Sequence, residues 1–235
     1  RPSMQPGLVQ FTLEVIDRIA YIHSNDNSGN TILMFLPGLR EIEDFYEALT
    51  NKNSTMEIDD SKIIESSNSS SNESNIEVCT LHSLIEQEEQ MKVFEPLEPG
   101  FTRVILATNI AESSVTLPQV RYVFDFGLQR QLELEQSTNY TSLISTWISK
   151  ASALQRSGRC GRLFPGITFR MYTESWYNNM DEFELPEMLR LSLSTTILRL
   201  KKLSENVDKD SPFYDPRESL KNALQPPEDE SIDFA

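Results

Sequence analysis

Apolar side chains recur at helical spacing in two segments near the start of the chain. In residues 8–23, and again in residues 39–49, they return at about every third or fourth position. Between these segments lies TILMFL (31–36), an almost wholly apolar run that Pro37-Gly38 ends. Such a run is typical of a strand covered on both faces, as in a parallel sheet. The pattern therefore predicts a helix, a buried strand and a second helix, in that order.

The alternation of apolar runs and helical spacing continues through the rest of the chain. Further strands are predicted at residues 76–81, 103–108, 120–125 and 167–172. Further helices are predicted around residues 86–95 and 150–160, and two strand-like stretches at about 128–136 and 142–148 suit a β-hairpin. Strands that alternate with helices of this length predict an α/β fold: a doubly wound, mostly parallel sheet flanked by helices.

Two segments depart from this alternation. Residues 51–75 are rich in Ser and Asn and show no core pattern, which predicts a disordered insertion. Residues 186–203 return to helical spacing after the last strand, and PRESLKNALQPP (216–227) predicts a short helix that ends at two prolines. We therefore expect a main domain over residues 1–180 and a C-terminal helical extension over residues 181–235.

The composition excludes several classes of protein. No apolar run approaches 20 residues, so no membrane span is expected, and the first residues lack the apolar region of a signal peptide. Cys79 and Cys160 are the two cysteines; their separation gives no metal spacing and indicates reduced thiols in a cytosolic protein. The net charge of −15 argues against nonspecific binding of nucleic acid.

The negative charge is unevenly spread along the chain. Residues 51–75 carry a net charge of −3 and residues 204–235 one of −6, so these peripheral segments hold −9 of the −15. By contrast, residues 149–170 contain five basic residues and no acid. An acidic chain can therefore still hold one local basic site.

That basic segment includes QRSGRCGR (155–162), in which Arg156, Arg159 and Arg162 recur every three residues. Guanidinium groups present rigid forks of donors that match phosphate oxygens, and the intervening glycines let a phosphate approach closely. On one helical turn, Arg159 and Arg162 would project from the same side. The alternative is that these arginines pair with nearby acids or with solvent.

A self-contained nucleotide site is excluded by the glycines. A Walker loop needs Gly-Lys followed by Ser or Thr, and none of the eight glycines precedes a lysine. No DEAH-like run of acids occurs, no metal site is expected, and His23 and His82 are the only histidines, with no catalytic triad spacing around them. If this chain touches a nucleotide, it does so as one half of a shared site.

Five motifs follow one another along the chain: ILMFLPGLREIE (32–43), LHSLIEQEEQMKVFEP (81–96), ATNIAESSVTLPQVRYVFDFG (107–127), SKASALQRSGRCGR (149–162) and PEMLR (186–190). In this order they resemble the second RecA-like domain of DEAH-box RNA helicases, and the resemblance covers most of residues 8–203 outside the insertion. Finer features such as ESSVTLPQV and YVFDFGLQRQL resemble the Tudor-domain DEAH helicases of germ cells. The resemblance implies a RecA-like fold, with residues 181–235 starting a winged-helix-like region.

The resemblance also implies how ATP would be used. Two RecA-like domains close over ATP with Mg²⁺, and the absent first domain supplies the Walker loop and the DEAH carboxylates. Arg159 and Arg162 match the arginines that reach the γ-phosphate, and Gln155 matches the glutamine that places the phosphate or attacking water. Ser114 matches the serine that senses the nucleotide state. Phe94 matches the ring that stacks on adenine, its alternative being ordinary packing on a helix face.

RNA contacts follow from the same motifs. Thr108 and Asn109 match contacts to the RNA backbone, and Thr116 is a weaker candidate on the same loop. His82 and Ser83, directly after a strand, match a further loop that touches the backbone. Contacts to phosphate and sugar carry little sequence preference. For His82 the equal alternative is a loop residue that caps the next helix, and the role of Arg156 is left open.

The resemblance implies a place in germline biology. It implies an RNA helicase of piRNA silencing and meiosis that acts in the cytoplasm, in perinuclear germ granules (nuage), with Piwi-pathway or scaffold proteins as partners. By itself, this chain is expected to hydrolyse no ATP. The alternative function is a protein-docking module that recruits the helicase to a germ-granule scaffold, through residues 39–49 or the acidic insertion.

Two departures from the family pattern stand out. Pro118 lies where many relatives have an acidic residue near the nucleotide ribose, and Cys160 replaces the more usual alanine. The first departure puts the ribose contact in doubt, whereas cysteine is small enough to be neutral at the second position.

Overall fold

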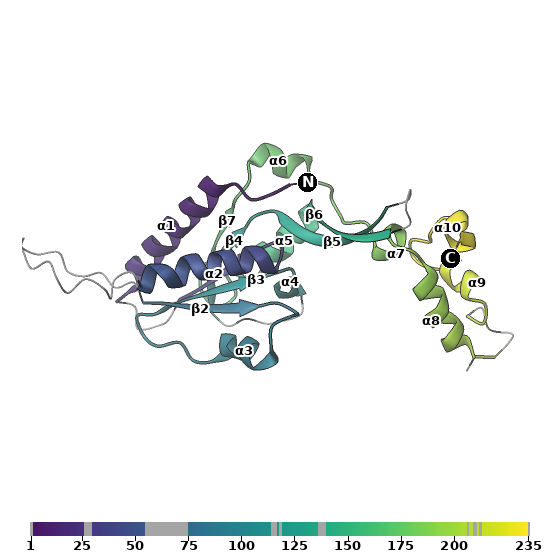
Figure 1. Ribbon diagram of the computed structural model, residues 1–235, viewed down its shortest axis with the longest axis horizontal. Coiled ribbons are helices and arrows are strands. Elements are labelled where there is room, and N and C mark those ends of the chain that lie inside the picture. The colour runs from purple at the N-terminus through teal and green to yellow at the C-terminus, as the bar shows by residue number, and fades with distance from the viewer. Residues whose placement is uncertain are drawn as a thin grey trace, which may run out of the picture. The chain divides into compact units, whose positions relative to one another are not determined.

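A computed structural model of the chain separates into two compact units (Figure 1). The first comprises Arg1–Arg130 and Ser145–Phe183, and the second comprises Gln131–Ile144 and Glu184–Ala235. The structure describes residues 2–25, 30–54, 75–113, 117, 119–135, 140–205, 207–208, 211 and 213–234. Residues 55–74 of the predicted insertion lie outside the described residues. The winged-helix-like character of residues 181–235 stays a prediction.

Five strands of the first unit form one parallel sheet, in the order β2-β3-β1-β4-β7. Every residue of β1 and β3 is buried, as the apolar run at residues 31–36 predicts for a strand covered on both faces. The doubly wound parallel sheet is thus confirmed. The strands are β1 (Asn30–Phe35), β2 (Ile76–Leu81), β3 (Thr102–Ala107), β4 (Val120–Asp125) and β7 (Ile167–Arg170).

Helices cover both faces of this sheet (Figure 1). On one face, α1 (Pro6–His23) and α2 (Leu39–Ser54) bury their apolar stripes against alternate residues of β1, β3 and β4. The other face packs against η1 (Lys92–Phe94), which follows α3 (Gln87–Met91), and against α4 (Ile110–Ser113). The helix α5 (Lys150–Ser157) contacts both α4 and β4. The short helix α6 (Glu174–Asn179) follows β7.

The predicted hairpin is present, because β5 (Leu128–Glu135) and β6 (Tyr140–Trp147) pair as a separate two-stranded sheet. Four residues join them, too few for the crossover that parallel strands need. In the second unit, α7 (Glu187–Arg190), α8 (Ser194–Ser204), α9 (Pro216–Lys221) and α10 (Asp229–Phe234) surround a small apolar cluster. Within the described residues, we find no helix of the length and apolarity that crossing a membrane requires.

Several predicted boundaries are wrong. The helix predicted at residues 39–49 continues to Ser54, so the first residues assigned to the insertion are helical. The single helix predicted over 186–203 is two helices, because the chain is extended at Leu191. The helix predicted over 150–160 ends at Ser157, where Gly158 follows as its C-cap. Arg159 and Arg162 therefore do not share a helical turn but lie in the connection to β7.

Candidate nucleotide and RNA site

The helix α5 is fixed at its start and along one face. Ser149 caps it, since its hydroxyl oxygen accepts a hydrogen bond from the backbone N–H of Ser152 at 3.2 Å. Ser152, Ala153 and Arg156 form the buried face, at the spacing that places residues on one side of a helix. Gln155 is exposed on the other side, as a direct role toward a ligand requires.

Arg156 is the buried centre of the site, with its side chain 1% exposed. Its Nε donates to Oε1 of Glu112 on α4 at 2.7 Å, and its Nη1 donates to Oδ1 of Asp125 at the end of β4 at 2.8 Å. Nη1 also donates to the backbone carbonyl of Leu128 at 3.2 Å. The guanidinium carbon lies 4.9 Å from the ring centre of Phe35 on β1. One side chain thus joins α5 to α4 and to the strands β1, β4 and β5.

Desolvation acts against the charge of Arg156, but its partners outweigh that effect. Burial lowers the pKa of Arg156, whereas the charges of Asp125 and Glu112 and their hydrogen bonds raise it, and the net shift is upward. Asp125 is itself fully buried and also accepts hydrogen bonds from the backbone N–H of Gly127 at 2.9 Å and the hydroxyl of Tyr172 at 3.0 Å. Arg156 therefore stays charged although it is buried. Its role, which the sequence left open, is to connect elements of the fold.

The two other arginines lie beyond the end of α5. Arg159 is half-buried, and its Nη2 donates to the backbone carbonyl of Glu112. Burial lowers the pKa of Arg159, and the charge of Arg162 adds to this, partly opposed by Glu112. Arg162 is exposed, and its Nε donates to the carbonyl of Gly158 at 3.3 Å. The guanidinium of Arg162 lies outside the buried network that holds Arg156, and that of Arg159 contacts this network through the backbone carbonyl of Glu112.

Tight backbone geometry follows these arginines. Gly161 has φ of 76°, the left-handed region that favours glycine. A Cβ on Gly166 would lie 2.6 Å from the backbone nitrogen of Gly161 and 2.8 Å from Cβ of Cys160, closer than side chains pack. The Sγ of Cys160 lies 3.3 Å from both the carbonyl of Ser157 and the hydroxyl of Thr168. The two glycines thus let the chain between α5 and β7 fold back on itself.

Glu112 connects this region to the candidate RNA contacts. Thr108 and Asn109 directly follow β3, and α4 begins one residue later. The carbonyl of Asn109 accepts from the N–H of Glu112 at 2.9 Å, and the carbonyl of Thr108 accepts from Ala111 at 3.1 Å. Asn109 is exposed, whereas Thr108 is only 9% exposed. The exposed side chain of Asn109 is therefore accessible to a ligand. The buried side chain of Thr108 is not, so any effect of Thr108 on a ligand would come from the backbone turn to which it belongs.

His82 and Ser83 follow β2, the neighbour of β3, as expected from the sequence. The Nδ1 of His82 accepts from the N–H of Leu84 at 3.1 Å, and its carbonyl accepts from the Gln90 side chain at 3.0 Å. Burial lowers the pKa of His82, so this turn favours the neutral imidazole. His82 therefore shapes the turn before α3 but does not cap that helix, whose N-cap is Glu86 and has no side-chain cap, while Ser83 is exposed.

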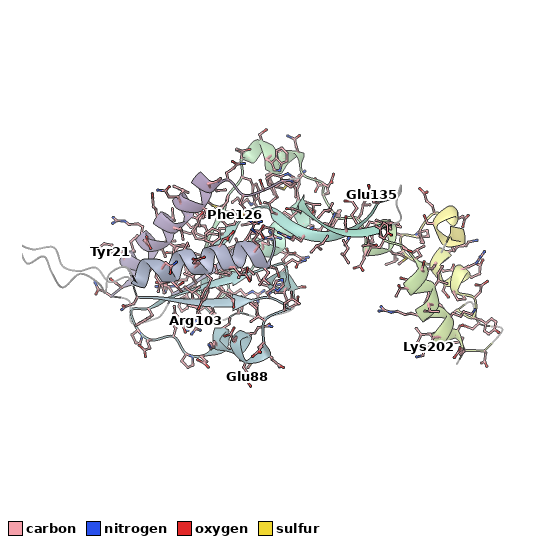
Figure 2. All side chains as sticks on the ribbon, viewed as in Figure 1. Tyr21, Glu88, Arg103, Phe126, Glu135 and Lys202 are labelled. Atoms are coloured by element: carbon pink, nitrogen blue, oxygen red, sulfur yellow. The ribbon has the colours of Figure 1, made fainter. Side chains whose placement is uncertain are left out.

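Phe94 lies on the same face of the sheet as α4 and α5. Its neighbour Val93 is buried in that face, while Phe94 is 42% exposed, and its contact with adenine stays a prediction. Arg103 on β3, labelled in Figure 2, anchors this segment: its Nη1 donates to the carbonyls of Val93 at 3.0 Å and Glu95 at 2.7 Å. Its Nε pairs with Glu77 at 2.7 Å.

The structure thus brings some predicted residues together and leaves others undecided. Arg159 and Asn109 both hydrogen-bond to the backbone of Glu112, whereas Ser114, Thr116 and Pro118 lie outside the described residues. The residues missed from the sequence are the two carboxylate partners of Arg156, Glu112 and Asp125, and Tyr172, whose hydroxyl donates to Asp125. In the described part of the chain, no group of three His, Cys, Asp or Glu side chains is arranged to hold a metal ion. The donors on offer suit phosphate rather than a metal.

Comparison with known proteins bears on this geometry. The family described as the helicase conserved C-terminal domain matches residues 13–164. Among solved structures, the crystal structure of the E. coli DExH-box NTPase HrpB superposes with a TM-score of 0.64 at 24% identity, covering 95% of this chain and 30% of that chain. The likeness confirms the predicted RecA-like fold.

Curated proteins are similar over most of the chain. It is 42% identical over 198 residues to the protein named ATP-dependent RNA helicase TDRD9 of Danio rerio, covering 84% of this chain and 13% of that protein. It is 42% identical over 199 residues to the probable ATP-dependent RNA helicase spindle-E of Drosophila yakuba, covering 83% and 12%. The human TDRD9 is 40% identical over 199 residues, covering 84% and 12%. The chain spans about an eighth of the length of these relatives.

Proposed function

This chain belongs to the family of the helicase conserved C-terminal domain, and from that membership we propose that it is the second RecA-like half of an ATP-dependent DEAH-box RNA helicase. Its similar relatives are named ATP-dependent RNA helicases, which supports both ATP and RNA as ligands. In the proposal, the first RecA-like domain of the same protein binds ATP with Mg²⁺, and this chain closes over the phosphates.

One observation carries the proposal: the three arginines of residues 155–162 divide into one held inside and two beyond the helix end. Arg156 pairs with the carboxylates of Glu112 and Asp125, whereas Arg159 and Arg162 donate to the backbone carbonyls of Glu112 and Gly158. Their forked donors suit the charge that develops on a transferred phosphoryl group. Gln155 is exposed one residue before Arg156 and would orient the phosphate or the attacking water.

RNA would bind beside the turns that follow β2 and β3. Asn109 and Ser83 are exposed there, at the carboxyl ends of two adjacent parallel strands. Loops at this end of an open α/β sheet are where such folds bind their ligands. Thr116 and Ser114 belong to the same proposal, and Phe94 would meet the adenine base through its exposed ring.

Removing an exposed arginine tests the proposal directly. In a protein that joins this chain to its first RecA-like domain, Arg162→Ala should lower RNA-stimulated ATP turnover by about 10³-fold or more, the range of an arginine finger. RNA binding should change by no more than a few fold. The matched control is Arg40→Ala, an exposed arginine on α2, the helix that covers the opposite face of the sheet. If Arg162→Ala retains a tenth of the turnover, the assignment is wrong.

The biological setting remains part of the proposal. The names TDRD9 and spindle-E support a helicase of the germline type, and we place the parent protein in piRNA silencing during meiosis, in cytoplasmic perinuclear germ granules with Piwi-pathway or scaffold proteins. The docking alternative rests on the exposed acids Glu43, Asp44 and Glu47 of α2. Binding of a purified scaffold protein to the chain, lost when these three acids become glutamine, would support that alternative.

A further inference from the structure

We propose that Arg156 is a positioning residue that holds Arg159 in place through Glu112, an inference that rests on the proposed function. Arg156 has no route to a ligand of its own, because its side chain is 1% exposed. What it contacts is Glu112, and Glu112 in turn contacts Arg159. The chain therefore uses one arginine of the cluster to set the geometry of another.

Glu112 is the link in this arrangement. Its carboxylate accepts from Nε of Arg156 at 2.7 Å, while its backbone carbonyl accepts from Nη2 of Arg159. The Glu112 side chain is 13% exposed, so the ion pair is largely shielded from water. A shift of the Arg156 guanidinium would move Glu112, and with it the oxygen that locates the guanidinium of Arg159.

Asp125 fixes the other side of Arg156. This buried carboxylate accepts from Nη1 at 2.8 Å, and its own position is set by the N–H of Gly127 and the hydroxyl of Tyr172. The guanidinium is thus clamped between β4 and α4, with the Phe35 ring against its face. A planar guanidinium can donate to the carboxylates of Glu112 and Asp125 at the same time. The ammonium group of a lysine at this position cannot reproduce both hydrogen bonds.

The contacts of Glu112 also connect the arginines proposed to act on ATP with the turn proposed to bind RNA. The helix α4 starts directly after Thr108 and Asn109, and its Glu112 holds both arginines. The carbonyl of Asn109 also accepts from the N–H of Glu112 at 2.9 Å. Loss of the Arg156 fork should therefore misplace Arg159 during turnover while leaving substrate binding largely intact.

The test is a double-mutant cycle in the full parent enzyme, measured as steady-state ATP hydrolysis with saturating RNA. Arg156→Lys alone should lower kcat by roughly 10- to 100-fold, the effect of a small misplacement of a catalytic group, with KM for ATP changed less than about threefold. In the Arg159→Ala background, the same change should lower kcat by less than about twofold, because the group that Arg156 positions is already gone.

A stability control separates positioning from simple unfolding. Leu49→Ala empties a buried site on α2, on the opposite face of the sheet, and should lower the melting temperature at least as much as Arg156→Lys with kcat unchanged. Arg156→Gln, which removes the charge as well as the fork, should lower kcat further than Arg156→Lys.

Three outcomes would overturn the inference. One is an Arg156→Lys enzyme with kcat within twofold of the unmodified enzyme while Arg159→Ala is inactive; this leaves the proposed function standing. Another is an equal fractional loss from Arg156→Lys in both backgrounds, which would mark a role independent of Arg159. The third is full activity of Arg159→Ala, which removes both this inference and the proposed role of that arginine.

Discussion

At the last position of β4, Asp125 receives hydrogen bonds from a guanidinium, a backbone N–H and a phenol. A fully buried carboxylate needs such partners, because removing one leaves an acceptor that water cannot reach. Tyr172 follows β7, the strand beside β4, and supplies the phenol. Three elements of the fold thus meet on one side chain.

Tyr172→Phe removes only the hydroxyl from this network. A hydrogen bond to a charged group contributes roughly 1.5–3 kcal/mol, so we expect the melting temperature to fall by roughly 3–10 °C in a calorimetric scan. The control is Tyr21→Phe on α1, whose ring is 47% exposed and whose melting temperature should hardly move. Equal melting temperatures for the Tyr172→Phe and unmodified proteins would contradict the role assigned to this hydroxyl.

The same residue makes a pH prediction. Burial, followed by the charge of Asp125 and its hydrogen bond, raises the pKa of Tyr172 well above the ordinary value of 10.0. Since the folded state holds the proton more tightly than the unfolded state, its stabilising effect is complete below pH 10 and is lost as the pH rises further. Unfolding titrations should show the decline above pH 10 to be shallower for Tyr172→Phe than for the unmodified protein.

The role of Arg156 could not be predicted from its own neighbourhood in sequence. The inward face of α5 is Ser152, Ala153 and Arg156, so hydrophobic periodicity does not reveal which side of the helix is buried. Its two carboxylate partners come from positions 112 and 125, and only the fold brings them together. The basic cluster itself, by contrast, was evident from its spacing and from the absence of acids around it.

At the scale of elements, the order of strands and helices was predictable where apolar periodicity was strong. The buried strands β1, β3 and β4 and the amphipathic helices α1 and α2 are of this kind. Short elements such as α4 and α6 were not predicted, since four to six residues carry too little periodic signal. Helix ends were also missed, because Gly158 at the end of α5 and the extended Leu191 act locally.

Gly127 illustrates how one backbone position connects elements. It joins β4 to β5 with φ of 71°, and a Cβ there would lie 2.7 Å from Cδ1 of Tyr172. Gly127→Ala should therefore destabilise the first unit by roughly 1–3 kcal/mol, through a left-handed alanine and a displaced Tyr172 ring. Denaturant unfolding would measure this.

Gly7 is the control for that substitution, because a Cβ at this position in the first turn of α1 meets no atom within 4 Å. Gly7→Ala should stabilise the protein by about 0.4–1 kcal/mol, since alanine restricts the unfolded chain without adding strain. If both substitutions changed the unfolding free energy in the same direction, the distinction drawn from their surroundings would be wrong.

At the scale of the whole molecule, the net charge of −15 and the phosphate-directed arginines coexist because they occupy different segments. Residues 149–170 contain no acid, and of the acids that reach this region in space, Glu112 and Asp125 are bound to Arg156 while Glu182 pairs with Lys150. The exposed side of the cluster thus keeps its positive character. An ATP site shared with another domain needs positive charge only near the phosphates, so a negative net charge on the rest of the chain is compatible with it.

Because the proposed ATP site is shared between two domains, we predict that this chain alone does not hydrolyse ATP. None of the eight glycines precedes a lysine, so the chain lacks the loop that cradles the phosphates of ATP. Alone, it should therefore show no ATP turnover above background and only weak nucleotide binding, measured by phosphate release and by fluorescent-nucleotide titration. Joined to the first RecA-like domain, it should gain RNA-stimulated turnover that Arg162→Ala removes. Turnover by the purified chain alone that survives Arg162→Ala would mean that it holds an ATP site independent of these arginines.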